Sequence, residues 1–236
     1  METPVNAPLK EKIRIEKANL REMDFKGKLD HIWEYYKLFI IGFIVIIIIL
    51  GSLINTWFIN PPPKTVLYIA WSAGFAFDEQ LSELTGSLKE RVIDETRNET
   101  VVVSQLYLAE DEPSMMMANT NRLAAMVAAG EIDLFVLDFE LLDEFTGNGI
   151  IAPMESILEK IKETYPHVYD KIVDKSIHMQ YESDEGNTVD RIMGISIKEC
   201  PLFSEIGFFE QDLYLSVSVT SQNFVNVINA VALFFE

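Results

Sequence analysis

The chain has 236 residues, 49% of them apolar, with 15 Phe and 8 Tyr, which excludes a disordered protein and allows a sizeable buried core. The net charge of −18 is uneven, because residues 1–37 hold eight Lys and Arg against seven Asp and Glu, whereas the rest holds eleven against thirty. Phosphate would be repelled by the acidic part, so we expect no nucleic-acid partner. Such a surface is either a solvated face or one that meets cations or a basic partner.

Residues 1–37 predict a charged cytoplasmic tail, much of it a short amphipathic helix that leads into an uncharged stretch at 38–59. As a helix, these roughly 22 residues would extend about 33 Å, enough to cross a hydrocarbon core of about 30 Å. Trp33 and Trp57 flank the stretch, where aromatic rings favour the membrane interface. The run is too long and begins too far from Met1 for a cleaved signal peptide. We therefore predict a single transmembrane helix at 38–59.

The charges and prolines around this stretch predict its orientation and its end. Lys26, Lys28 and Lys37 precede it, whereas Lys64 alone follows it closely, so the positive-inside rule places the N-terminus in the cytoplasm. Three prolines then end the helix and make residues 60–64 a Pro-rich spacer. We expect a single-pass plasma-membrane protein with an extracellular domain at 65–236.

The extracellular part alternates between strand and helix patterns. Apolar runs predict strands at 65–71, 100–108, 132–137, 191–197 and 212–219. Apolar residues at helical spacing predict helices at 78–93, 113–128, 139–145, from 157 to 161 and at 223–235. Residues 167–177 read as helix or loop, and 182–188 as an exposed turn. The alternation predicts an α/β domain, with a mainly parallel sheet and helices on both faces.

Neither a metal site nor a cofactor site is predicted. Cys200 is the single cysteine, so it forms no internal disulfide and is expected to be a small buried thiol. The consecutive residues Met115–Met117 point in different directions on a helix and cannot converge on one copper ion. Glu110–Glu112 lacks the alternate spacing and glycine of a calcium loop. No glycine-rich phosphate or dinucleotide motif is present, so we expect no cofactor.

The stretch NRLAAMVAAGEIDLFVLD at 121–138 resembles extracellular solute-binding proteins of family 1, the maltodextrin-binding type, in which a helix ending in Ala-Ala-Gly is followed by a strand and another helix. Residues 141–154 (LLDEFTGNGIIAPM) are similar to the next helix of that family. Residues 215–223 (LSVSVTSQN) and the helix after them look like its returning strand. The resemblance covers roughly 64–155 and 191–236 and implies one periplasmic-binding-protein-like lobe.

The chain departs from that family in length. Members are about twice as long as this external domain and hold a second lobe between the two matching blocks, where only about 35 residues stand here. The chain thus resembles one lobe of a two-lobed clamp. Residues 25–37, before the apolar span, resemble uncharacterised membrane proteins of Gram-positive bacteria, which implies a bacterial plasma membrane.

Two functions follow from a single lobe. Two-lobed receptors close around a ligand and bury most of its surface, so one lobe offers half a site. The favoured hypothesis is a non-enzymatic interaction module that docks a protein partner, or its own copy, at the cell surface. The alternative is binding of a small, sugar-like extracellular solute. An enzyme is a third reading, but with thirty acidic residues some carboxylate pairing is inevitable and carries no information.

Both readings place the binding surface in the crevice at the carboxyl ends of the parallel strands. The candidate ligand-binding residues follow the first three strands: Trp71, Ser72, Phe75 and Phe77 after the first, Glu110 and Asp111 after the second, Asp138 and Phe139 after the third. Aromatic rings there could stack on sugar faces or pack on helix ends.

Overall fold

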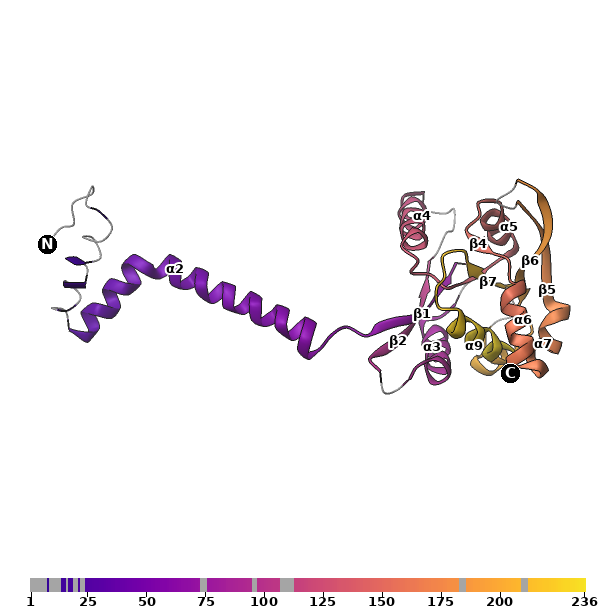
Figure 1. Ribbon diagram of the computed structural model, residues 1–236, viewed down its shortest axis with the longest axis horizontal. Coiled ribbons are helices and arrows are strands. Elements are labelled where there is room, and N and C mark those ends of the chain that lie inside the picture. Colours follow the sequence, from indigo (N-terminus) through magenta and orange to yellow (C-terminus); the bar gives the residue numbers. More distant parts are fainter. Residues whose placement is uncertain are drawn as a thin grey trace. The chain divides into compact units, whose positions relative to one another are not determined.

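The computed structural model describes residues 8, 14–15, 17–18, 21, 24–72, 76–94, 97–106, 113–182, 186–208 and 212–236. The chain divides into two compact units, Met1–Pro62 and Pro63–Glu236. The first contains one long helix and the second a mixed α/β domain, each drawn in Figure 1.

The long helix α2 runs from Phe25 to Ile54 and continues as a π-helical turn, Asn55–Ile59. Asp24 caps its start by accepting a hydrogen bond from the backbone N–H of Gly27 at 2.9 Å. The segment Tyr36–Ile59, which covers most of α2 and the π-helical turn, contains an 18-residue window with a mean hydropathy of 2.9, so it is long and apolar enough to cross a membrane. The helix is continuous through Lys37, so tail and predicted span share one element.

The domain is built on one seven-stranded sheet, of order β2-β1-β3-β7-β6-β5, with β4 paired to β7. The strands are β1 Lys64–Trp71, β2 Glu99–Gln105, β3 Leu134–Leu137, β4 Ile151–Ala152, β5 Ser176–Glu182, β6 Thr188–Ser196 and β7 Tyr214–Ser218. β1 is parallel to β2 and β3, whereas β7 is antiparallel to β3, β4 and β6, and β5 is antiparallel to β6. The predicted α/β class is confirmed, but the expectation of a mainly parallel sheet is corrected to a mixed one. Five residues, 183–187, separate β5 from β6, too few for the crossover of a dozen or more residues that a parallel pair requires.

Helices cover both faces of the sheet. They are α3 Asp78–Val92, α4 Pro113–Ala128, α5 Phe139–Gly147, α6 Glu155–Thr164, α7 Pro166–Ile172, α8 Pro201–Ile206 and α9 Phe224–Phe235. Residues of α3, α6, α7, α8 and α9 share one buried cluster, and residues of α4 and α5 share the other. In Figure 1, α4 and α5 accordingly lie on the side of the sheet away from α3 and α9.

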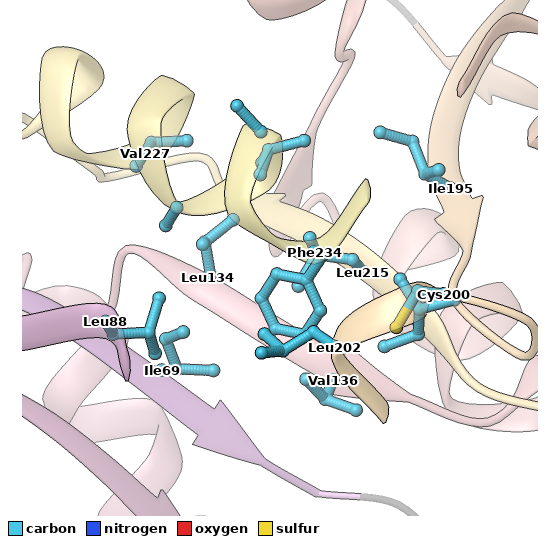
Figure 2. Close-up of a cluster of buried hydrophobic side chains, with 14 of the residues drawn as sticks. Ile69, Leu88, Leu134, Val136, Ile195, Cys200, Leu202, Leu215, Val227 and Phe234 are labelled. Atoms are coloured by element: carbon cyan, nitrogen blue, oxygen red, sulfur yellow. The ribbon is translucent and has the colours of Figure 1, made fainter. Parts of the chain in front are cut away.

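The larger cluster lies under α9 (Figure 2). The α9 residues Val227, Val231 and Phe234, spaced four and three apart, are buried in it. Strand β3 contributes side chains to the clusters on both faces of the sheet, because successive residues of a strand point to opposite faces. Leu134 and Val136 belong to this cluster, and Phe135 and Leu137 belong to the other. All four are fully buried, which explains the uninterrupted apolar run in the sequence.

Besides the two-residue strand β4, the structure adds two elements that the sequence did not predict. Residues 176–182, read partly as helix or loop and partly as a turn, form β5. Its signal was the alternation of Ile177, Met179 and Tyr181, all of which pack against the second cluster. The other element is α8. Cys200 precedes it and is fully buried, as predicted, and burial raises the pKa of its thiol to about 11.

Candidate functional site

Helix α4 is attached to the domain by few side chains. Leu123 and Met126 are its buried residues among those whose side chains the structure describes. Its end is fixed by Gly130, which has φ +68°, and by the Thr220 hydroxyl, which donates to the carbonyl oxygen of Val127 at 2.9 Å. The carboxyl end of α4 is therefore held firmly while much of its surface stays uncovered.

Helix α5 is seated more deeply. The Asp138 carboxylate caps its start by accepting from the backbone N–H of Leu141 at 2.9 Å. Leu142 and Phe145 are buried, and the Phe145 ring meets Phe135 of β3 edge-on with centroids 5.4 Å apart. One face of α5 thus packs on the sheet, leaving an adjoining face toward α4.

A groove of about 390 Å³ lies between these two helices. Its lining residues recur every three or four positions on each helix and are Thr120, Leu123, Ala124, Val127 and Ala128 from α4, Leu141, Glu144 and Phe145 from α5, and Asn148 and Ile150 after it. The groove is thus bounded by one stripe from each helix, mostly apolar, and its volume falls within the range of ligand sites, about 300–1,000 Å³. Leu123 and Phe145 connect it to the second core cluster.

Glu144 gives the groove its charge. Its side chain is exposed, and no ion pair or side-chain hydrogen bond joins it to the residues that the structure describes. It is the one ionisable side chain among the described residues that line the groove. Within the described ranges, no group of three His, Cys, Asp or Glu side chains is arranged to hold a metal ion.

The predicted residues at the end of β1 lie in the interior or at a helix start. Trp71 is fully buried, with its ring stacked on Phe208 at 5.0 Å and tilted against Phe203 at 5.7 Å. Ser72 is buried as well. Phe77 is 49% exposed and precedes α3, where its backbone N–H donates to the Gln80 side chain. The ring of Trp71 therefore faces other aromatic side chains and not solvent.

The remaining predicted residues flank α5 or lie outside the described ranges. Asp138 is the helix cap described above, and Phe139 is 55% exposed, with its ring against Tyr214 at 6.0 Å. Phe75, Glu110 and Asp111 lie outside the described residues. None of the predicted residues that the structure describes lines the α4–α5 groove. The ligand-binding prediction for these eight residues therefore stays a prediction.

Two polar groups at the end of β1 stand out by their lack of partners. Trp71 Nε1 and Ser72 Oγ are buried, and neither has a hydrogen-bond partner among the residues described here. Leaving such a group unsatisfied costs about 1–3 kcal/mol. A polar ligand atom at the carboxyl end of β1 would relieve that cost.

The groove itself was not predicted. A partial signal was present in residues 123–129, where the sequence LAAMVAA is small or apolar on every side although only Leu123 and Met126 are buried. A helix that is apolar around its circumference yet packed on one side leaves apolar surface uncovered. The α5 wall could not be inferred in this way, because its position depends on the sheet.

No protein-family model matches the chain, and no curated protein matches it. Two solved structures match part of it, and both are solute-binding proteins. An ABC substrate-binding protein of Listeria monocytogenes in complex with cycloalternan is 17% identical, with a TM-score of 0.33, over 58% of this chain and 29% of that one. An extracellular solute-binding protein of family 1 from Alicyclobacillus acidocaldarius is 15% identical, with a TM-score of 0.28, over 58% and 28%. This chain matches less than a third of the length of either, and at TM-scores below 0.5 neither carries its ligand over to it.

Proposed function

We propose that this protein is a membrane-anchored, non-enzymatic interaction module that docks an apolar segment of a partner protein in the α4–α5 groove. The observation that carries the proposal is the groove itself, which has a volume of about 390 Å³ and a mostly apolar lining from two helices. An open apolar concavity is the kind of surface in which ligands and partner segments bind. A hydrophobic groove can receive the apolar face of an amphipathic helical segment.

The long helix supplies the anchor in this proposal. Tyr36–Ile59 would span the plasma membrane, with the N-terminus in the cytoplasm and the domain outside. Its isoleucines are about half exposed in the structure, for example Ile46 at 55% and Ile49 at 52%, a surface suited to lipid contact. Tethering would restrict the module to partners at the cell surface.

The chemistry of the groove supports a binding role over catalysis. General acid–base catalysis usually requires two positioned ionisable groups, and nucleophilic catalysis requires a nucleophile beside a base. Among the described lining residues, Glu144 is the one ionisable group, and the others are uncharged and mostly apolar. Binding through burial of apolar surface requires nothing further.

Matched tryptophan substitutions test this proposal. Ala128 lines the groove, whereas Ala125, on the same helix and also exposed, does not. The full chain would be purified from membranes of cells that produce it, as wild type, Ala128→Trp and Ala125→Trp. A partner recovered with wild type and Ala125→Trp but lost with Ala128→Trp would then be purified and titrated against all three.

We expect the affinity of the purified partner to fall at least about tenfold with Ala128→Trp and to stay unchanged with Ala125→Trp. Equal binding to all three forms would overturn docking in the groove.

A second candidate function is the binding of a small polar solute at the carboxyl end of β1, where Trp71 Nε1 and Ser72 Oγ have no hydrogen-bond partner among the described residues. Without a ligand, Ser72→Ala removes an unsatisfied buried hydroxyl, so the free energy of unfolding should stay within about 0.5 kcal/mol of wild type or rise. A sugar that binds there should raise the melting temperature of wild type but shift Ser72→Ala much less. Thermal unfolding of both full-length proteins against a sugar panel checks this. A loss of more than about 1 kcal/mol in ligand-free Ser72→Ala would mean that the hydroxyl already has a partner.

A further inference from the structure

We infer that the segment received by the α4–α5 groove is a short amphipathic helix carrying basic residues beside its apolar face. This inference rests on the proposed docking function and specifies the chemistry of the partner. It draws on three observations: the length of the groove, the charge of its α5 wall and the charge of the whole domain.

The lining stripes fix the size of the occupant. On α4 they extend from Thr120 to Ala128, and along α5 and its C-cap from Leu141 to Asn148. At 1.5 Å per residue, each wall is about 10–12 Å long, which is about two helical turns. A segment of that length places apolar side chains at positions i, i+3 or i+4, and i+7 into the groove, matching the spacing of both walls.

Helix α5 is acidic, and one of its carboxylates lies on the groove. Helix α5 carries Glu140, Asp143 and Glu144 and no Lys or Arg, and all three acidic side chains are exposed. Glu144 lies on the groove, with no ion-pair partner among the described residues. A Lys or Arg beside the apolar face of a docked helix would meet this carboxylate at the rim, where charge sets specificity and association rate.

The charge of the whole domain makes a second copy a poor occupant. Residues 38–236 carry eleven Lys and Arg against thirty Asp and Glu, a net charge of −19, and two such domains repel each other. The same field attracts a basic segment and steers it toward the domain. A partner segment with basic residues therefore complements both the Glu144 carboxylate on the groove and the negative charge of the whole domain.

The test is a peptide titration against the full chain in nanodiscs of zwitterionic lipid. The probe is a fluorescent, designed helical peptide of about 12 residues with leucines at helical spacing and lysines elsewhere. Its comparison peptide has every lysine replaced by glutamate, and empty nanodiscs measure binding to lipid. Three variants accompany wild type: Glu144→Gln, Glu140→Gln and Ala128→Trp. Glu140→Gln removes the same charge from the same helix but outside the groove lining, so it is the matched control.

We expect the lysine peptide to bind wild type and the glutamate peptide not to bind. Glu144→Gln should weaken binding roughly threefold to fivefold at low ionic strength, Glu140→Gln should change it little, and Ala128→Trp should weaken it at least about tenfold.

If both peptides bind equally and Ala128→Trp weakens both, the groove docks apolar segments but the inferred basic character of the segment is wrong. If the lysine peptide binds all four proteins alike, it reports general acidity and the inference fails. If neither peptide binds, the inference also fails, and the docking proposal is decided separately by the partner experiment.

Discussion

The carboxylate of Asp133, directly before β3, is 1% exposed and accepts hydrogen bonds from three residues in two separate parts of the chain. The donors are the backbone N–H of Tyr68 at 2.9 Å, the Ser221 hydroxyl at 2.7 Å and the Asn223 side chain at 3.1 Å. They come from β1 and from the turn before α9. A single side chain thus joins the sheet to the start of the helix that covers it.

Replacing this side chain should cost stability in a pH-dependent way. Asp133→Ala removes the acceptor of three hydrogen bonds and leaves their donors unpaired. We therefore expect the free energy of unfolding to fall by about 2–4 kcal/mol near neutral pH. Burial raises the pKa of Asp133 above its ordinary value of 3.8, against the opposing effect of its hydrogen bonds. Because the folded pKa is the higher one, the contribution of this group is complete below the unfolded pKa and declines as pH rises through the folded pKa.

The advantage of wild type over Asp133→Ala should therefore be largest at the acid end and shrink toward neutral pH. Urea unfolding of both full-length proteins across this range measures it. An advantage that grows with pH would show that the carboxylate is stabilised in its charged form.

At the scale of elements, Gly194 of β6 determines how closely α5 approaches the sheet. A Cβ atom at this position would lie 3.2 Å from Ser216 Oγ and 3.3 Å from the Leu142 side chain. Both neighbours are fully buried, and the Ser216 hydroxyl donates to the Met193 carbonyl at 2.8 Å. Neither can move away easily, so the absence of a side chain at Gly194 keeps the α5 wall of the groove in place.

Gly194→Ala should therefore lower the free energy of unfolding by about 1–2 kcal/mol. The matched control is Gly86→Ala, in the exposed middle of α3, where an added Cβ meets no atom within 4 Å. That substitution should raise stability by up to about 1 kcal/mol, because alanine favours the helix. Urea unfolding of both variants compares them, and equal effects at the two glycines would contradict the close seating of α5.

The elements were predictable where one residue's environment is set by its neighbours in sequence. The stripe of Leu81, Leu84 and Leu88 predicted α3, and all three are buried. Gly130, with its positive φ, follows the helix that the sequence predicts at 113–128, as a glycine at a helix end commonly does. Strand direction was not predictable in this way, because it depends on which strand returns beside β3. The groove depends on the spacing between α4 and α5, which no local pattern encodes, and thus it emerged from the structure alone.

At the scale of the whole molecule, the two units differ in the polarity of their surfaces. Helix α2 and the π-helical turn after it expose apolar side chains over Tyr36–Ile59, whereas the acidic domain buries its apolar residues in two clusters. We expect the full chain to remain in the membrane fraction after alkaline carbonate washing, because its span would have to enter water to leave. Immunoblotting of pellet and supernatant measures this. Release of the full chain into the carbonate supernatant would contradict the transmembrane proposal.

Site-specific photocrosslinking in living cells tests the docking role of the α4–α5 groove most directly. A photoreactive amino acid would replace Ala124 or Ala128, which line the groove, or Asn121 or Ala125, which are exposed on α4 away from it. We expect Ala124 and Ala128 to yield the same partner adduct and Asn121 and Ala125 to yield little, and we expect the crosslinked peptide of the partner to be a short apolar helix segment. Equal adducts from all four positions, or adducts from Asn121 and Ala125 alone, would contradict it.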